Sequence, residues 1–294
     1  MSHAFLFPGQ GSEGPEMGGA ALGRPGPVRR LVERASAALE VDLEAIVRRG
    51  DPSLARTELG QPALVAISLG LALESLVRPS ATAGHSVGEL AAFALAGCLS
   101  PEDAVDCTVE RARLMADAAR RNPGSMAALR ASVDQLQDAL ALGRSAGSLE
   151  LAAHNSPEEL VVTGDRAALA ALSSRYFTVP LSVSGPWHSA AMRDAADSWR
   201  LGLERLSWQR PRVPLVSNAT GSFVRDENLV ELLAGQLSQP VQWVATLGTL
   251  RSAGIQTFDL FGPARVLRGL CRANLGTSAI VVLHDGVDSP ELRA

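Results

Sequence analysis

A serine flanked by small residues is the clearest candidate for chemistry in this chain. Residues 84–88 read Gly-His-Ser-Val-Gly, the G-x-S-x-G pattern that places a serine on a sharp turn between a strand and a helix. An apolar segment precedes the pattern, and the helix-forming residues 91–96 follow it. Such a turn exposes the hydroxyl of Ser86, and the helix start directs free N–H groups toward an anion formed beside it. The pattern therefore predicts a nucleophilic serine, although it is too short to prove one by itself.

A serine hydroxyl needs a base within hydrogen-bonding reach to become a good nucleophile. All 27 basic residues are arginines, so a Ser-Lys dyad is excluded. The remaining candidates are the carboxylates and the five histidines: His3, His85, His154, His188 and His284. We favour His188, because it lies where a predicted small subdomain returns to the large one, which is a natural place for a cleft. His284 is the alternative, since a hydrolase triad would have its histidine late in the chain.

Strands and helices alternate in the first and last parts of the chain, which predicts an α/β fold. Residues 4–7 form a predicted strand that ends in a glycine-containing loop, the kind of position where open α/β sheets carry their sites. Thr57 and Ser100 are predicted N-caps of helices. Further strands are predicted at 213–217, 257–261 and 279–283, and single helices at 28–48, 189–206, 229–237 and 244–253.

The middle of the chain has a different order of elements. Its strands are predicted at 126–129, 149–153, 159–163 and 177–184, with helices at 132–142 and 165–174. This β-α-β-β-α-β order is that of ferredoxin-like units. We therefore predict a small ferredoxin-like subdomain at 124–185. It is inserted into a large α/β-hydrolase-like domain with a central, mostly parallel sheet, formed by 1–123 and 186–294.

Composition excludes several classes of protein. The net charge of −4 argues against nucleic acid as a partner. The most apolar window, 63–77, is too short to span a membrane and is interrupted by Glu74. The three cysteines lack CxxC spacing, so no metal site is predicted, and reduced thiols are expected. Residues 1–8 lack the features of a signal peptide. A cytoplasmic, monomeric protein is expected.

Taken together, the motifs resemble those of the acyl carrier protein S-acyltransferases. This family includes malonyl-CoA:carrier-protein transacylases and the acyltransferase domains of polyketide synthases. The matching segments extend over nearly the whole chain: 7–12, 61–64, 84–89, 111–115, 155–157 and 262–263. The resemblance implies ping-pong transfer of an acyl group, malonyl above all, from CoA to the phosphopantetheine thiol of an acyl carrier protein. The intermediate would be an acyl-serine.

The resemblance also implies a role for each matching residue of the catalytic centre. Ser86 would be the nucleophile and His188 its base. The backbone N–H groups of Gln10 and Val87 would form the oxyanion hole. A backbone carbonyl would orient the histidine, and here it belongs to Gln239, where the family usually has asparagine. Because this acceptor is part of the main chain, the substitution should matter little.

Substrate binding is implied for five side chains: Arg111, Gln61, Trp187, Asn155 and His85. Arg111 would hold the free carboxylate of a malonyl group in a bidentate pair, with Arg113 as a nearby rival. Trp187 departs from the family, whose malonyl-type members carry a small residue or phenylalanine directly before the histidine. Its bulk would crowd a branch at the acyl α-carbon and favour malonyl over methylmalonyl, or it would reshape the pocket for another acyl group.

The implied partners are acyl-CoA and an acyl carrier protein, and no bound cofactor is expected. Carrier proteins are commonly acidic, so arginines such as Arg120, Arg121 and Arg130 could dock one. Two alternatives stay open. One is an acyltransferase or hydrolase that acts on acyl groups already attached to a carrier protein in polyketide biosynthesis. The other is an α/β-hydrolase esterase that uses His284 as its base.

Overall fold

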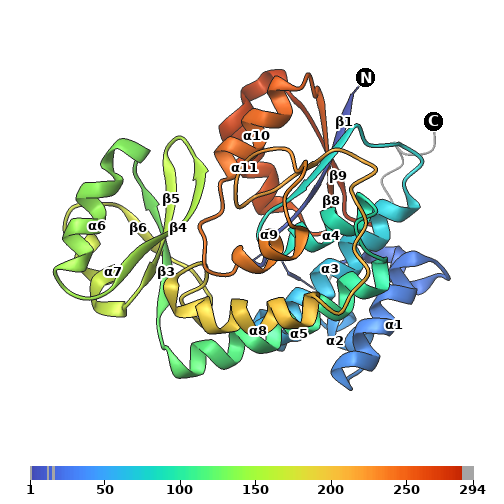
Figure 1. Cartoon of the computed structure of the whole chain (residues 1–294), viewed down its shortest axis with the longest axis horizontal. Helices are drawn as coiled ribbons and strands as arrows, with labels where there is room; N and C mark the ends of the chain where they lie inside the picture. The colour runs from blue at the N-terminus through green and yellow to red at the C-terminus, as the bar shows by residue number, and fades with distance from the viewer. Residues whose placement is uncertain (1, 12, 15–16, 287–294) are drawn as a thin grey trace.

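The computed structural model describes residues 2–11, 13, 14 and 17–286 and contains a parallel sheet in the order β7-β2-β1-β8-β9 (Figure 1). Every pairing between neighbouring strands in this sheet is parallel, as predicted. The predicted strand at 257–261 has the expected bounds, whereas the one at 213–217 is reduced to two residues. The strands are β1 (His3–Phe7), β2 (Ala81–Gly84), β7 (Leu215–Val216), β8 (Thr257–Phe261) and β9 (Ile280–His284).

Helices pack around this sheet, as its central strands require, since all of their residues except His3 are buried. The α-helices of this part are α1 (Pro27–Leu39), α2 (Leu43–Arg48), α3 (Thr57–Glu74), α4 (Gly88–Leu95), α5 (Pro101–Arg121), α8 (Arg193–Leu203), α9 (Leu229–Gly235), α10 (Trp243–Ser252) and α11 (Arg265–Leu275). Short 3-10 turns lie at η1 (Gly19–Gly23), η2 (Pro52–Ala55), η4 (Ala190–Met192) and η5 (Gly276–Ser278). Ser100 caps α5 as predicted, by accepting a hydrogen bond from the backbone N–H of Asp103. Thr57 does not cap α3; it is the first residue of that helix, and its hydroxyl donates to Gln10 instead.

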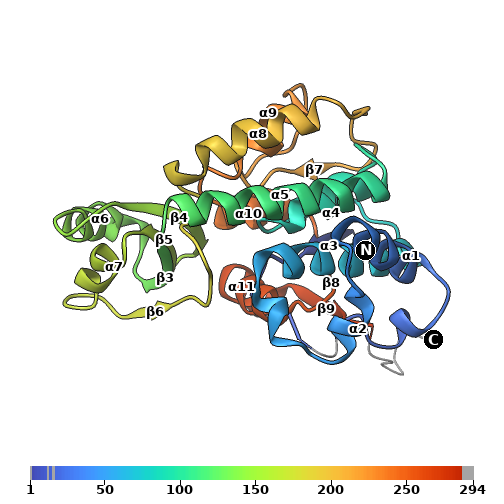
Figure 2. The same ribbon diagram turned by 90° about the horizontal axis from the view of Figure 1, so that it is seen from below.

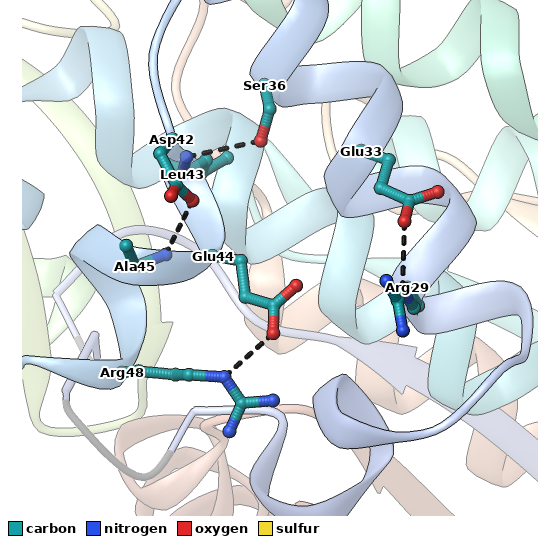
Figure 3. A network of polar contacts seen from close by, with 8 residues as sticks. All are labelled: Arg29, Glu33, Ser36, Asp42, Leu43, Glu44, Ala45 and Arg48. Carbon is teal, nitrogen blue, oxygen red and sulfur yellow. Dashed lines mark hydrogen bonds and ion pairs between the residues drawn. The ribbon is translucent and has the colours of Figure 1, made fainter.

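The single helix predicted at 28–48 is wrong, because the chain turns between α1 and α2. Glu40 adopts the left-handed region, with φ of 58°, and ends α1. The carboxylate of Asp42 then accepts the backbone N–H of Ala45 at 2.9 Å and caps α2 (Figure 3). The hydroxyl of Ser36 accepts the N–H of Leu43, which ties the start of α2 back to α1. The apolar spacing continues through the turn, so periodicity alone could not locate it.

A second, antiparallel sheet in the order β4-β5-β3-β6 forms the ferredoxin-like arrangement predicted for the middle of the chain. Helices α6 and α7 pack against it, and their apolar residues form a core separate from the larger one. In Figure 1 this part lies to the left of the parallel sheet. Its elements are β3 (Ser125–Arg130), η3 (Val133–Gln135), α6 (Leu136–Arg144), β4 (Leu149–Ser156), β5 (Glu159–Gly164), α7 (Arg166–Leu172) and β6 (Thr178–Pro180).

Helix α5 and strand β4 connect the two sheets. Helix α5 packs against α3 and α8 and extends toward β3, which follows it in the chain (Figure 2). The backbone of β4 also pairs with the segment before α10. His154 donates its N–H to the carbonyl of Val241, whose own N–H donates to Ala152, both at 2.9 Å. These bonds fix the antiparallel sheet beside the parallel one and so define the walls of a cleft between them.

Two predictions made from the composition, on the cysteines and on membrane-spanning helices, can be compared with the described residues. Cys98, Cys107 and Cys271 are buried and unpaired, and burial raises the pKa of each thiol to about 12. They are therefore inert apolar side chains at neutral pH. Among the described helices, none combines the length and apolar character needed to cross a membrane.

Candidate active site

Ser86 lies on a tight turn that follows β2 directly and leads into α4. Its φ of 50° is in the left-handed region, as a strained strand-to-helix turn requires. Glycines make the turn possible. A Cβ on Gly84 would lie 2.1 Å from the backbone of Gly88, and one on Gly88 would lie 2.5 Å from the carbonyl oxygen of Phe7. The close backbone contacts at this turn thus explain why the motif has small residues on both sides of Ser86.

The loop after β1 packs against this turn. Because β1 and β2 are neighbouring parallel strands, their carboxyl ends meet at one edge of the sheet. The backbone N–H of His85 donates to the carbonyl of Phe7 at 2.9 Å, and a Cβ on Gly9 would lie 2.8 Å from the His85 ring. Among the described residues, none accepts a hydrogen bond from the backbone N–H of Gln10 or of Val87. Within that part of the chain, both N–H groups are available as donors. Ser12, the last residue of the segment 7–12, lies outside the described residues.

The Oγ atom of Ser86 lies 2.8 Å from Nε2 of His188. On the other side of the ring, Nδ1 lies 2.8 Å from the carbonyl oxygen of Gln236 and 3.2 Å from that of Gln239. A carbonyl oxygen can only accept, so Nδ1 must carry the proton and Nε2 is left to accept the serine hydroxyl. Both carbonyls follow the end of α9, where main-chain oxygens lack helical partners. Sequence reasoning named Gln239, but the shorter contact belongs to Gln236.

The environment keeps His188 neutral. The side chain is buried, and burial together with the nearby positive charge of Arg111 lowers the pKa of His188 to about 3. The hydrogen bonds to the two carbonyls oppose this shift without cancelling it. At neutral pH the ring is therefore an unprotonated acceptor, which is the form a general base needs.

Arg111 extends from α5 to a position behind Ser86 and is fully buried. Its Nη1 donates to Oε1 of Gln61 at 2.5 Å, and its Nη2 donates to Oε1 of Gln236 at 2.6 Å. The same Nη2 lies 3.4 Å from Oγ of Ser86. Burial lowers the pKa of Arg111 to about 9, against the opposing effect of the Glu89 carboxylate, so the guanidinium remains charged at neutral pH. A positive charge thus lies close enough to the serine to meet an anionic group attached to it.

Gln61 connects Arg111 to the loop after β1. While its Oε1 accepts from Arg111, its Nε2 donates to the hydroxyl of Thr57 at 2.6 Å. That hydroxyl in turn donates to Oε1 of Gln10 at 3.0 Å. The glutamine side chain therefore fixes the guanidinium and the candidate oxyanion loop relative to each other.

His85 and Asn155 bond to each other across the two sheets. Nε2 of His85 lies 3.0 Å from Oδ1 of Asn155, and Nδ2 of Asn155 donates to Glu159 at 3.0 Å. This orientation of the amide makes Nε2 of His85 the protonated nitrogen. Burial lowers the pKa of His85, so its ring is neutral as well.

A cleft of about 390 Å³ opens in front of Ser86 and His188. It is bordered by the loop after β1, by strands of the antiparallel sheet and by α11, so it lies between the two sheets. Trp187 forms part of its wall with a side chain only 5% exposed, and its Nε1 has no partner among the described residues. Apolar residues dominate the wall away from the serine: Met126, Ala128, Ala153, Val161, Leu181, Val183, Val241, Val266, Leu267 and Leu270.

Two rivals named from the sequence do not reach this site. Nε2 of His284 is bonded to Asp259 at 2.8 Å, and its ring stacks on Phe261 with centroids 4.5 Å apart. His284 does not line the cleft. Arg113 donates to the carbonyl of Ala38 at the end of α1. The structure therefore brings His188 and Arg111 to Ser86 and keeps His284 and Arg113 away.

Sequence reasoning missed two residues of this site, Gln236 and Glu89. The amide of Gln236 contacts Arg111, while its carbonyl accepts from His188. Nothing in the local sequence distinguishes this glutamine from the nearby Gln239 and Gln242. Glu89 is fully buried in the first turn of α4. It could have been singled out, because a carboxylate inside an otherwise apolar helix next to the serine is costly to bury without a purpose.

A serine at a nucleophile elbow, hydrogen-bonded to a buried histidine, defines the class of enzymes that act through an acyl-serine. The chain belongs to the acyl transferase family, because the model of the acyl transferase domain matches residues 4–258. The family resemblance of the motifs is thereby confirmed.

Characterised relatives cover nearly the whole chain. The chain is 34% identical to the malonyl CoA-acyl carrier protein transacylase of Bacillus subtilis, over 92% of this chain and 89% of that protein. It is 32% identical to the transacylase of the same name from Escherichia coli, over 96% of each. It is also 33% identical to the polyketide biosynthesis protein ThaF of Burkholderia thailandensis, over 94% of this chain but 24% of that longer protein.

Solved structures of such proteins share the fold. The malonyl CoA-acyl carrier protein transacylase of Clostridium perfringens superimposes with a TM-score of 0.90, at 27% identity, covering 99% of this chain and 96% of that one. The malonyl-CoA:acyl carrier protein transacylase of Xanthomonas oryzae gives a TM-score of 0.89 at 32% identity, covering 97% and 96%. The combination of a parallel and a small antiparallel sheet is therefore the architecture of this family.

Proposed function

We propose that this chain transfers a malonyl group from CoA to the phosphopantetheine thiol of an acyl carrier protein, through a malonyl ester on Ser86. The observation that carries the proposal is the position of the Arg111 guanidinium, 3.4 Å from the nucleophilic oxygen. The free carboxylate of a malonyl group on Ser86 is only a few bonds away from that oxygen. A buried cation at this distance favours an acyl group that ends in an anion.

In the first half-reaction the hydroxyl proton of Ser86 moves to Nε2 of His188 as Oγ attacks the thioester carbon. The resulting oxyanion is held by the backbone N–H groups of Gln10 and Val87, each contributing about 3 kcal/mol. The intermediate then collapses by breaking its carbon–sulfur bond. His188 returns the proton to the departing thiol, and the malonyl ester on Ser86 remains.

The second half-reaction runs the same steps in reverse. The thiol of the carrier protein gives its proton to His188 and attacks the ester carbon. When the carbon–oxygen bond breaks, Ser86 recovers the proton from His188, and the malonyl thioester leaves on the carrier. These steps use only groups of this chain and the two substrates, so the proposed reaction needs no bound cofactor.

A carbonyl pair takes the place that a carboxylate has in a serine hydrolase triad. Gln236 and Gln239 fix the ring of His188 without adding negative charge beside it. We infer that the base is weaker than one held by aspartate. A weaker base activates a thiol more readily than water, since the thiol is the more acidic nucleophile. This arrangement therefore favours transfer over hydrolysis.

The remaining expectations complete the proposal. We assign residues 1–123 and 186–294 to the large domain and 124–185 to the inserted subdomain, so that the two domains enclose the acyl group between them. The separate apolar core under α6 and α7 supports this division. The buried thiols suit a reducing compartment, and we infer that the enzyme acts in the cytoplasm as a monomer.

Intact-mass spectrometry after exposure to malonyl-CoA tests the proposed function. We expect the wild-type protein to gain the mass of one malonyl group, and Ser86→Ala to gain none. Ser182→Ala is the matched control, because Ser182 also lines the cleft, and it should still be acylated. A wild-type protein that gains no mass from malonyl-CoA would reject malonyl transfer from CoA.

A second candidate function follows from the similarity to a polyketide biosynthesis protein. In this alternative the same Ser86 accepts acyl groups from a carrier protein instead of from CoA. Presenting the wild-type protein with the same acyl group on CoA and on a carrier protein distinguishes the two. Adducts formed only from the carrier-bound donor would favour the alternative.

A further inference from the structure

Glu89 is a fully buried carboxylate whose role the proposed mechanism does not include. It lies three residues after Ser86, and it does not line the cleft. Its Oε1 accepts the backbone N–H of Asn218 at 2.8 Å, and its Oε2 accepts Nε2 of Gln236 at 2.6 Å. Both oxygens of a buried acid are thus used to hold two particular groups, which is a costly arrangement unless it maintains something.

The group that Glu89 holds in place is the side-chain amide of Gln236, which lies between the negative charge of Glu89 and the positive charge of Arg111. Its Nε2 donates to Glu89 and, at 3.2 Å, to the carbonyl of Ser86. Its Oε1 accepts from Arg111. A carboxylate can only accept and a guanidinium can only donate, so the amide between them has one satisfactory orientation.

We propose that Glu89 is a positioning residue that fixes the orientation of the Gln236 amide and thereby holds the Arg111 guanidinium beside Ser86. This inference rests on the proposed function, in which Arg111 binds the free carboxylate of the acyl group. Glu89 acts through Gln236 and does not itself meet the substrate. The chain from Glu89 through Gln236 to Arg111 links helices α4 and α5 through the residue that follows α9.

Protonation of Glu89 would disturb this chain. Burial raises the pKa of Glu89 to about 7, although bonds to Asn218, Ser217 and Gln236 and the charge of Arg111 oppose the shift. The backbone N–H of Asn218 and the amide of Gln236 can only donate to Glu89, so a protonated oxygen that faces either group would lose that bond. The charged or titratable groups near Glu89 are Arg111 on α5 and, across Gln236, the ring of His188, which is neutral. Of these groups, only Glu89 therefore changes its charge near neutral pH.

A reciprocal exchange of acid and amide tests the inference. In Glu89→Gln, an amide oxygen that accepts from Asn218 leaves an NH₂ group facing the NH₂ group of Gln236. If the Gln236 amide then rotates, its NH₂ group faces the guanidinium of Arg111, so one contact is lost in either arrangement. The double variant Glu89→Gln/Gln236→Glu restores an acceptor toward both the new amide and Arg111. In Gln236→Glu alone, two acceptors face each other.

We expect each single variant to lower kcat/KM for malonyl-CoA roughly 10- to 100-fold, as expected for a lost hydrogen bond to a charged group. Acetyl-CoA has no free carboxylate, so its kcat/KM should change much less. The double variant should recover part of the loss, because it restores the acceptors toward the new amide and Arg111 but leaves the carbonyl of Ser86 without the N–H that Gln236 donates. The acid limb of the wild-type pH profile, near pH 7, should shift to lower pH in the double variant, because its carboxylate lies directly against Arg111. A double variant no better than the worse single variant, or an unshifted acid limb, would overturn the inference.

Stability provides a readout that does not depend on the reaction. Urea unfolding of the four proteins should show both single variants destabilised and the double variant partly restored. Absence of this coupling rejects the Glu89–Gln236 contact whatever the substrate is. Coupling in stability without recovery of the malonyl over acetyl preference rejects the positioning role. Failure of the proposed function gives a different result: malonyl-CoA does not acylate Ser86 of the wild-type protein. In that case the preference of the variants for one acyl group over another is measured with the donor that does acylate Ser86.

Discussion

Nε2 of His188 lies 2.8 Å from Oγ of Ser86, although 102 positions separate the two residues in the chain. The contact depends on both sheets, because Ser86 follows a strand of the parallel sheet and His188 lies in the segment that returns from the antiparallel one. His188 itself adopts φ of 58°, a second left-handed residue at the point of contact. Two strained turns thus meet, and such strain is found where a site must hold a fixed geometry.

Replacing His188 with alanine should lower kcat/KM for malonyl transfer roughly 10²- to 10⁴-fold, because Ser86 loses the imidazole that lies 2.8 Å from its Oγ. The matched control is His284→Ala, which removes a histidine that is bonded to Asp259 and does not line the cleft. Steady-state kinetics with malonyl-CoA and a carrier protein measure both. Loss of activity at His284 with activity retained at His188 would contradict the assignment of the base.

Replacing Arg111 with alanine should reduce the preference for malonyl over acetyl donors. The variant removes the only cation within 3.4 Å of Oγ of Ser86 among the described residues, and a charge-assisted bond of this kind is worth about 1.5–3 kcal/mol. We therefore expect a roughly 10- to 100-fold fall in kcat/KM for malonyl-CoA and a smaller change for acetyl-CoA. Arg113→Ala, on the same helix but bonded to Ala38, should leave the preference unchanged. An equal loss with both donors would indicate a structural role for Arg111 instead.

The sequence predicted the architecture well where short-range signals decide it. The change from a β-α order to β-α-β-β-α-β identified the antiparallel sheet, and serine followed by proline located the start of α5. The prediction from the sequence failed where a single backbone angle determines the structure. At Glu40 a left-handed turn divides one continuous apolar pattern into two helices. The strand predicted at 177–184 is likewise limited to β6, because only three of its residues pair with β3.

The candidate site was predictable in its motifs but not in its connections. Ser86 and Arg111 lie in recognisable motifs, whereas His188 was favoured for its place at the return from the subdomain; the structure places all three together. Gln236 could not be found from the sequence, because its importance comes from where the end of α9 lies relative to α4 and α5. The two terminal guanidinium nitrogens of Arg111 each donate to a glutamine, while its Nε has no partner among the described residues. Because a guanidinium carries five N–H groups, donors remain for a bound carboxylate.

Replacing Trp187 with phenylalanine should widen the range of acyl groups that the cleft accepts. The indole ring is buried against Gly185, where an added Cβ would lie 2.6 Å from it, so the ring cannot retreat in that direction. We propose that this wall of the cleft crowds a branch at the α-carbon of an acyl group on Ser86. One methyl group changes discrimination by about 1–3 kcal/mol, so kcat/KM for methylmalonyl-CoA should rise about 10- to 100-fold relative to malonyl-CoA. Competition between the two donors, read by intact mass, measures the ratio, and an unchanged ratio would remove Trp187 from acyl selection.

The pH dependence of stability should reveal two opposing buried groups. The pKa of Glu89 is raised from its usual 4.5 to about 7, so its contribution to stability is fully present below pH 4.5 and is lost as the pH rises through 7. The pKa of His188 is lowered from 6.5 to about 3, so its contribution is present above pH 6.5 and is lost as the pH falls toward 3. Between pH 7 and pH 5 each changes the free energy of unfolding by about 2 kcal/mol, with opposite sign.

Single variants should separate these two contributions. On going from pH 7 to pH 5, Glu89→Gln retains only the His188 contribution and should lose about 2 kcal/mol of stability. His188→Asn retains only the Glu89 contribution and should gain about the same amount. The double variant Glu89→Gln/His188→Asn supplies the background from all other groups, and urea unfolding at several pH values measures each slope. Two single variants with slopes of the same sign relative to that background would show that the two groups do not oppose each other.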